Sequence, residues 1–434
     1  MIFLRTLALW LFAGLEVLCA APERPVPAPV LTEKPTTLTW VECVRLATLH
    51  NPDLQSAREG VLNSNAVRRG AYSSLFPQIS ASFNTSRSYN AAYLSAPSNY
   101  STAYGAQISI SQKIFDGFAT KGGIDQAKAE LALAFANLNS QKAAISFDLK
   151  TAFSQLLYAQ KLIELSSNVI EIRENTAKLV KLLYEGGSED KGAMLLSQAN
   201  LAQANNDYGQ AQRTFSLSGF QLSVVIGQVL GKPVRGQGQL QTSPLPDEPS
   251  FRALALKTPA YFQQQARADA ALAGITIANS GWYPRIFANG SYDRSGSDFP
   301  PQQSGFSGGV SVNIPIFEGG QTYFNVKAAQ ASLRQSLDEL RSGTDQAALT
   351  LAQTFKSMVD TENNVRIQEQ LLEATELRYK IAAARYRNGL MSFQDYNSIT
   401  DNYVNQQKTC LASQRDAVIA EANWEQARGL GAIP

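Results

Sequence analysis

The chain has 434 residues, with 38 Lys or Arg against 36 Asp or Glu, so its formal net charge is +2. This balance gives no indication of a nucleic-acid or polyanion partner. Hydrophobic residues make up 44% of the chain, and no apolar run after the N-terminus is long enough for a membrane helix. Any membrane-spanning element of the mature chain would therefore have to be a strand.

Residues 1–21 have the pattern of a secretory signal peptide. Arg5 supplies the positive charge, an apolar core follows, and small residues offer cleavage after Ala20 or the next alanine. Cys19 raises the alternative of a lipoprotein, but the residues before it match a lipidation signal poorly. Residues 22–37 are rich in proline and polar side chains, which predicts an extended tether.

Two short helices are expected next. Thr39 and Glu42 have the spacing of a capping box, so a helix should begin here and end before Asn51-Pro52. A second helix is expected from Pro52, a residue favoured in a first helical turn, to about Tyr72. The lone histidine, beside Asn51, is expected at a helix end and not as a ligand.

Two segments of the first half alternate apolar and polar residues with the period of a half-buried strand. They are Phe76–Arg87 and Tyr104–Ile114, each about 10 residues long, which suffices to cross a bilayer when tilted. Between them, Asn84–Thr102 is rich in Ser, Asn and Tyr and is expected to form an outer loop.

A very long helical pattern follows over Ala119–Tyr184. At about 1.5 Å per residue it would extend on the order of 100 Å, which indicates a coiled coil, a helix bundle or the wall of a duct. A glycine pair ending at Gly187 interrupts the pattern, and helix is expected again over 191–225.

The second half repeats this plan after a linker-like stretch at 231–250. The predicted units are therefore 38–230 and 251–434. The repeated elements are a short helix at Phe251–Lys257, strands at Tyr283–Arg294 and Phe306–Ile316, a loop at Gly296–Gln303, a long helix at Gln321–Tyr386 and a final helix to about Arg428.

Residue spacings support an internal duplication. Pro77 and Pro284 are 207 residues apart, whereas Tyr184 and Tyr386 are 202 residues apart. The offset changes once, within the outer loop, where a duplication tolerates a difference in length. Four strands are too few to close one barrel, and a sheet in lipid must close. Strands in a membrane would therefore have to be shared among several chains.

Several segments, in this order and spacing, resemble a known family. They are Leu38–Cys43 with Asn51–Leu54, Leu75–Ile79, Ile114–Gly117, Ile316–Gly319, and Arg385–Ser392 with Asp395. Over nearly all of residues 38–434 the chain resembles TolC-like outer-membrane efflux proteins.

The resemblance implies a mostly α fold with a membrane β-barrel. Three chains would share a 12-stranded barrel, four strands from each, above a long periplasmic α-helical barrel. It also implies a passive exit duct in a tripartite efflux pump or a type I secretion system, with a periplasmic adaptor and an inner-membrane transporter as partners. The duct would stay closed at its tip until these partners engage.

The family pattern also suggests functional residues. Asp395 stands where an acidic residue would ring the narrowest point, and Ser398 replaces the next acidic position, so one carboxylate per chain is expected. The alternative is an ordinary exposed helix aspartate. Gly187 and Gly389 are expected to form the tip turns. The remaining candidates are the adaptor contacts Leu390, Met391 and Ser392, and the strand–helix junctions Phe115, Asp116, Gly117, Phe317, Glu318 and Gly319.

Other features carry a structural alternative. An aromatic girdle at the lipid boundary, or the core of a soluble sheet, would use Tyr89, Tyr93, Tyr100, Tyr104, Tyr292 and Phe306. Cys43 and Cys410 are expected to be buried free thiols, with a disulfide as the alternative. The first tip, residues 184–192, is more charged than the second and departs from the family's usual Gly-Leu-x-Ser pattern, so its adaptor recognition is expected to differ.

The sequence has no metal-ligand spacing, nucleophile elbow or phosphate loop, so no metal, cofactor or enzymatic activity is expected. The competing functions are a secreted coiled-coil scaffold or adhesin and a periplasmic adaptor. Neither class accounts for four phased strands. Drug, metal and protein export are equally compatible with the sequence.

Overall fold

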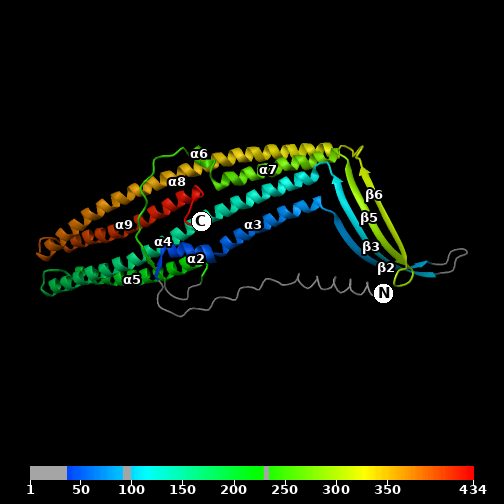
Figure 1. Ribbon diagram of the computed structural model, residues 1–434. Helices are drawn as coiled ribbons and strands as arrows, with labels where there is room; N and C mark the ends of the chain where they lie inside the picture. The colour runs from blue at the N-terminus through cyan, green and yellow to red at the C-terminus, as the bar shows by residue number, and fades with distance from the viewer. Residues whose placement is uncertain (1–36, 91–98, 229–233) are drawn as a thin grey trace.

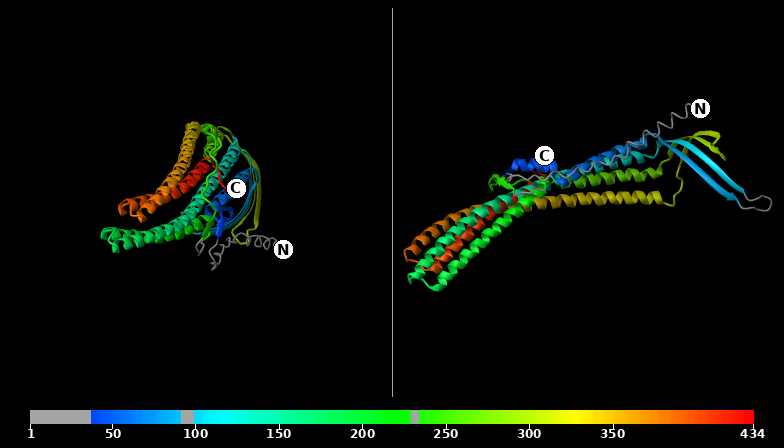
Figure 2. Two further views of the ribbon diagram at one scale, coloured as in Figure 1. Left: turned by 90° about the vertical axis from the view of Figure 1, so that its left-hand side faces the viewer. Right: turned by 90° about the horizontal axis from the view of Figure 1, so that it is seen from below.

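A computed structural model describes residues 37–90, 99–228 and 234–434. The expected signal peptide and lipidation site, all but the last residue of the expected tether, and the girdle residue Tyr93 lie outside the described residues. The chain is long and narrow, with a sheet at one end and two helical hairpins at the other (Figure 1). Seen along its length it is a curved wall, one part of an arc (Figure 2).

Each hairpin consists of a very long helix and a shorter one. The first is α4 (Ala119–Glu185) with α5 (Lys191–Ile226), and the second is α8 (Gln321–Arg387) with α9 (Phe393–Ala427). α4 and α8 each have 67 residues, so each extends about 100 Å. The expected long helices, their breaks and their repetition are confirmed. No helix in the described part of the chain is both long and apolar enough to cross a membrane.

Shorter helices lie beside α4 and α8, which themselves reach the sheet (Figure 1). α2 (Trp40–His50) and α3 (Pro52–Ala71) precede the first strand pair, and α6 (Phe251–Ala255) and α7 (Pro259–Asn279) precede the second. Their starts follow the expected local chemistry. Thr39 and Glu42 form a reciprocal capping box on α2. The Asn51 side chain caps α3, whose first residue is proline, and a threonine caps α7 in the same way.

The sheet is antiparallel, with the order β2-β3-β5-β6. Its strands are β2 (Gln78–Asn90), β3 (Asn99–Phe115), β5 (Arg285–Gly296) and β6 (Gln303–Asn313). The first pair extends into the segment expected to be a loop, because Tyr89 pairs with Tyr100 and the Ser88 and Ser101 hydroxyls hydrogen-bond at 2.8 Å. The last strand ends before the expected Ile316, since Pro315 has no N–H to donate.

The register sorts the side chains onto two faces. One, which we call the apolar face, carries Ile79, Ala81, Phe83, Ile108, Ile110, Ile286, Ala288, Tyr292, Phe306, Val310 and Val312. The other, the polar face, carries rows of hydroxyl and amide groups. Ser80 and Ser109 lie 2.8 Å apart there, and Ser291 and Ser307 lie 2.9 Å apart. The predicted period-two alternation is therefore confirmed in all four strands.

The linker expected at 231–250 has structure that its composition did not predict. β4 (Arg235–Gln237) pairs in parallel with β1 (Thr37–Thr39). Gly236 donates its N–H to the Gln160 side chain of α4 at 2.6 Å and accepts from the same amide at 3.1 Å. These two bonds fasten the linker to α4.

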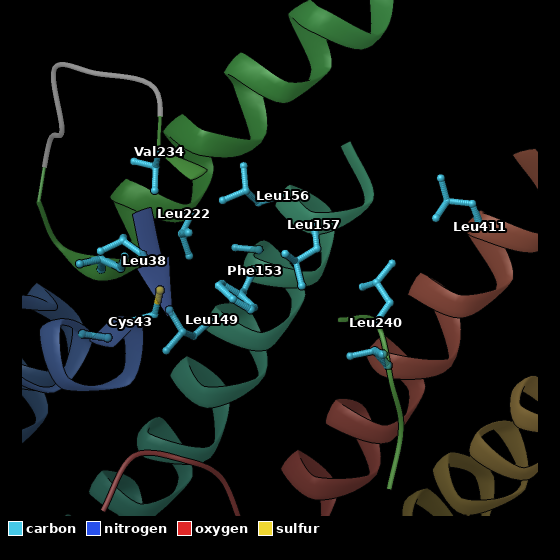
Figure 3. Close-up of a cluster of buried hydrophobic side chains, with 14 residues drawn as sticks. Leu38, Cys43, Leu149, Phe153, Leu156, Leu157, Leu222, Val234, Leu240 and Leu411 are labelled. Atoms are coloured by element: carbon cyan, nitrogen blue, oxygen red, sulfur yellow. The ribbon is translucent and has the colours of Figure 1, made fainter. Parts of the chain in front are cut away.

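The main core lies where the linker, α2, α4, α5 and α9 meet. Figure 3 shows Cys43 beside Leu149 and Phe153, with Leu240 of the linker toward Leu411 of α9. Cys43 and Cys410 are both buried free thiols, as expected. Burial raises the pKa of Cys43 to about 12, so this thiol stays protonated at neutral pH. The lone histidine, His50, ends α2, also as expected.

Candidate functional site

The hairpin ends form the first candidate site, and both reverse the chain in the same way. Gly187 (φ +74°) follows α4 and Gly389 (φ +71°) follows α8. In each turn the residue after the glycine donates its N–H back into the helix: Ser188 to the Leu183 carbonyl at 2.8 Å, and Leu390 to the Arg385 carbonyl at 2.9 Å. Both are therefore helix-ending turns that need a left-handed residue, and glycine adopts that conformation without strain.

The two turns differ in how the next helix begins. Asp190 caps α5 by accepting the Ala193 N–H at 2.8 Å. Ser392 caps α9 by accepting the Asp395 N–H at 3.1 Å and donates its hydroxyl to the Asp395 carboxylate at 2.7 Å. Asp395 is exposed in the first turn of α9. Its carboxylate therefore supports a helix cap and still faces solvent on its other side.

The expected adaptor contacts divide into exposed and packed side chains. Leu390 is 74% exposed and projects from the second turn. Ser392 is also exposed, whereas Met391 is partly buried against the cluster beneath the turn. Of the three, Leu390 is the apolar group most open to a partner.

Beneath the turns, the hairpins pack on each other. Val180 and Ala193 of the first hairpin are buried with Ala382, Tyr386 and Phe393 of the second. The hydroxyl of Tyr386, which is 2% exposed, donates to the Glu189 carboxylate at 3.0 Å. Burial raises the pKa of the Tyr386 hydroxyl, and the Glu189 carboxylate raises it further. The hydroxyl therefore stays protonated, and can donate this hydrogen bond, at any physiological pH.

A polar network continues this contact up the hairpins. The buried Arg173 of α4 bonds to Asn397 at 3.2 Å and pairs with Asp401, both on α9. Asn200 of α5 also donates to Asn397, at 2.9 Å. Sequence patterns did not single out these residues, because each pairing joins positions about 200 residues apart that only the fold brings together.

The strand–helix junctions form a second candidate site, and the first junction is closed. Asp116 accepts from the Thr120 N–H at 2.9 Å and from its hydroxyl at 2.6 Å. The Phe115 ring lies 6.4 Å from that of Tyr283, measured between ring centroids. Gly117 (φ +66°) leaves no space for a side chain, since an added Cβ would lie 2.7 Å from the Ser280 carbonyl oxygen.

The second junction repeats this chemistry but is open. Glu318 accepts from the Thr322 hydroxyl at 2.5 Å, as Asp116 does from Thr120. Gly319 has nearly the same φ as its counterpart, +59°, but an added Cβ there would meet nothing within 4 Å. Phe317 is 88% exposed. The two junctions are thus built alike, but in the described part of the chain the phenylalanine and the first glycine are covered only in the first junction, while the second is held at Thr322 against Gly281.

Comparison with known proteins fits this architecture. The family model described as outer membrane efflux protein matches residues 43–228 and again residues 254–430. The chain belongs to the outer membrane efflux protein family. Its two matched segments correspond to the two hairpin-bearing halves of the fold, in agreement with the duplication predicted from the residue offsets.

Individual members of the outer membrane efflux protein family are distant relatives. Antibiotic efflux pump outer membrane protein ArpC of Pseudomonas putida is 23% identical over 418 residues, covering 90% of this chain and 82% of that protein. Cation efflux system protein CusC of Escherichia coli is 22% identical over 366 residues, covering 80% and 77%. The Campylobacter jejuni CmeC outer membrane channel superposes with a TM-score of 0.79 at 16% identity, covering 94% of each chain.

Membership in this family decides between the functions that the sequence left open. The chain is an outer-membrane efflux channel component with the mixed helical and β channel fold, and it is not an enzyme. The competing interpretations as a secreted scaffold or a periplasmic adaptor are therefore wrong. Asp395, the tip residues and the junction residues occupy the positions described above, and their roles are taken up below as proposals.

Proposed function

We propose that three copies of this chain form the exit duct of a tripartite efflux pump in the outer membrane. Each chain contributes four strands to a 12-stranded barrel and two helical hairpins to a periplasmic tunnel. The duct is passive, and an inner-membrane transporter reached through a periplasmic adaptor supplies and selects the substrate. Relatives named as pump proteins favour this assignment over type I secretion.

The open second junction is the observation that carries the assembly. Within the chain, Phe115 and Gly117 of the first junction pack on Ser280 and Tyr283, which lead into β5. The duplication makes Ser73 and Phe76, which lead into β2, the counterparts of Ser280 and Tyr283 at the 207-residue offset. Phe76 is exposed as well.

A neighbouring copy supplies what each chain lacks. Phe317 and Gly319 are the counterparts of Phe115 and Gly117 at the 202-residue offset. Placing them on Ser73 and Phe76 of the next chain repeats the packing already made inside one chain. The same step brings the free edge of β6 to the free edge of β2, which pairs the backbone groups that an open sheet leaves unsatisfied in lipid.

The two hairpin ends are the proposed contact for the adaptor. Leu390 offers an apolar anchor on the second turn, and the charged first turn is joined to the same hairpin by the hydrogen bond from Tyr386 to Glu189. The hydrogen bond between Tyr386 and Glu189 is among the contacts that keep the hairpins together. An adaptor that binds at these ends touches both hairpins and can therefore separate one hairpin from the other.

Extraction and crosslinking test this function. The mature protein should leave the membrane only in detergent and migrate as a trimer on native gels. A photoreactive residue in place of Leu390 should capture a periplasmic protein in the intact cell, and the same residue at the exposed Val41 of α2 should not. A water-soluble monomer that captures no partner would refute the duct.

Asp395 is proposed to ring the constriction with one carboxylate from each chain. Three carboxylates around one axis attract cations and repel anions. We expect Asp395→Asn to bring the cation-to-anion permeability ratio close to one while preserving the cap, because the amide oxygen still accepts from Ser392. Reversal potentials of single channels under a salt gradient measure this ratio. Asp338→Asn, on an exposed face of α8, is the matched control, and an unchanged ratio in Asp395→Asn would remove the proposed ring.

A further inference from the structure

Two arginines stand on the apolar face of the sheet. Arg87 of β2 follows Ile79, Ala81 and Phe83 with the same parity, and Arg294 of β5 pairs with Ala106 on that face. Along the described strands no other charged residue has this parity. Lys113, Arg285 and Asp293 all project to the polar face.

Each arginine follows the apolar residues of its own strand toward the end of the sheet farthest from the helices; Arg294 lies in the row of Ala106 and Phe83, and Arg87 lies farther out, opposite Thr102. From the helix side, β2 presents Ile79, Ala81, Phe83 and Thr85 on the apolar face before Arg87. On β5, the apolar-face positions from Ile286 to Tyr292 precede Arg294. On β2 and on β5, the arginine is thus the first charged side chain after the apolar residues of that strand's apolar face.

Aromatic rings border this position. The Arg87 guanidinium carbon lies 4.8 Å from the centre of the Tyr100 ring, and that ring lies 4.8 Å from the Tyr89 ring. Phe299 of the β5–β6 turn packs on Phe83 at 6.2 Å and on Tyr104 at 5.7 Å. An arginine held over an aromatic face keeps the N–H groups at its edge free to bind an anion.

Neither arginine is neutralised within the described part of the chain. Both are exposed, and no described carboxylate lies within ion-pair distance of either. The β2–β3 connection, residues 91–98, contains no Asp or Glu in its sequence. The apolar face of the strands therefore carries two positive charges from each chain and no carboxylate; the acidic residues at this end are Asp293 on the polar face and Asp298 in the β5–β6 turn.

We propose that Arg87 and Arg294 bind the phosphate groups of lipid headgroups in the outer leaflet of the outer membrane. The proposal rests on the trimeric barrel, because it requires the apolar face to contact lipid and the helix-free end to face outward. Acyl chains then lie along the isoleucines and valines, and the phosphates reach the guanidinium groups at the rim. Arginine suits this role because its planar N–H groups bind phosphate in a bidentate manner.

A comparison of two lipids tests the site. The detergent-extracted trimer is titrated with lipid A and, separately, with lipid A stripped of both phosphates, and bound lipid is counted by native mass spectrometry. One basic residue near an anionic headgroup is worth about a factor of five in affinity. We expect Arg87→Gln or Arg294→Gln to weaken binding of lipid A about fivefold and the double variant about 25-fold.

Matched variants separate charge from general disturbance. Arg285→Gln removes the same charge from the polar face of β5 and should leave lipid A binding unchanged. The double variant Arg87→Lys with Arg294→Lys keeps the charge and should bind within a few-fold of the unaltered trimer. Inorganic phosphate at millimolar concentration should not displace lipid A, since free phosphate lacks the acyl chains.

The outcomes are distinct. Equal retention of both lipids, no loss in the double glutamine variant, or displacement by millimolar phosphate would each overturn the lipid site. Such results in a chain that is extracted as a trimer would leave the duct intact. If the unaltered chain were instead a soluble monomer, the duct itself would be refuted, and the lipid site with it.

Discussion

Glutamate in place of Phe317 should leave the chain folded but unable to form trimers or to export substrate. The side chain is 88% exposed within one chain, so its replacement disturbs little there. In the proposed contact between neighbouring copies, which we call the seam, Phe317 is covered by Phe76 of the next copy. An unpaired carboxylate buried there among apolar groups costs several kcal/mol. Three such seams close the ring, so the cost is paid threefold. Trimer content on native gels and resistance of cells to pump substrates measure the result.

The opposite side of the seam gives the reciprocal variant. Phe76→Glu should abolish the trimer to the same degree, because it introduces the charge from the neighbouring copy's side. Val41→Glu is the control, since Val41 is exposed on α2, away from the sheet and its junctions, and a charge there meets water. Normal trimers in Phe317→Glu would contradict the seam.

Paired cysteines locate the contact directly. The internal counterpart places the centres of the Phe115 and Tyr283 rings 6.4 Å apart, so cysteines replacing Phe317 and Phe76 are expected within reach of a short bifunctional thiol crosslinker between chains. Each link should join two polypeptides on denaturing gels. Cysteines replacing Phe115 and Tyr283 should link within one chain and leave its mass unchanged. The native Cys43 and Cys410 are buried and do not compete.

Much of this fold could be predicted because its signals are local and repeated. Period-two alternation marked all four strands, and glycines requiring positive φ marked both hairpin turns. Strand ends were less accurate. β2 and β3 continue through Ser and Tyr pairs whose stabilisation comes from the opposite strand, and one strand seen alone does not reveal its partner.

Long-range contacts account for what sequence reasoning missed. The three-residue strands β1 and β4 are too short to show a period, and they form because Val234 and Leu240 of the linker bury themselves in the core. Likewise, Tyr386 and Glu189 are 197 residues apart and meet only when the hairpins pack. The glycine positions predicted where the candidate tip lies, but the contacts beneath it required the structure.

The linker also takes part in an ion cluster beside the main core. Lys150 of α4 bonds to Glu421 at 3.0 Å and to Glu425 at 3.2 Å, both on α9. The backbone N–H of Ser243 in the linker donates to Glu421 at 3.1 Å. Lys150→Ala leaves Glu421 buried without its cation, so we expect a loss of about 3 kcal/mol in unfolding free energy, measured by urea unfolding at pH 7.

The pH dependence of this loss tests its cause. Burial by itself raises the pKa of Glu421, but the bonds from Ser243 and Lys150 outweigh it, and the net pKa lies below the usual value. The unaltered chain therefore keeps this stabilisation above about pH 4.5 and loses it as the pH falls through the lowered pKa. Without Lys150 burial dominates, so Glu421 takes up a proton at a higher pH and ceases to be an unpaired charge.

The deficit of Lys150→Ala should consequently be largest at pH 7 and shrink toward pH 4. A deficit independent of pH would mean that lost packing, not the stranded carboxylate, destabilises the variant. Lys380→Ala breaks the exposed pair with Glu376 within α8 and should cause no measurable change at either pH, since such pairs are screened by water. Combining Lys150→Met with Glu421→Gln should restore most of the stability, because the amide oxygen still accepts from Ser243 and no charge remains buried.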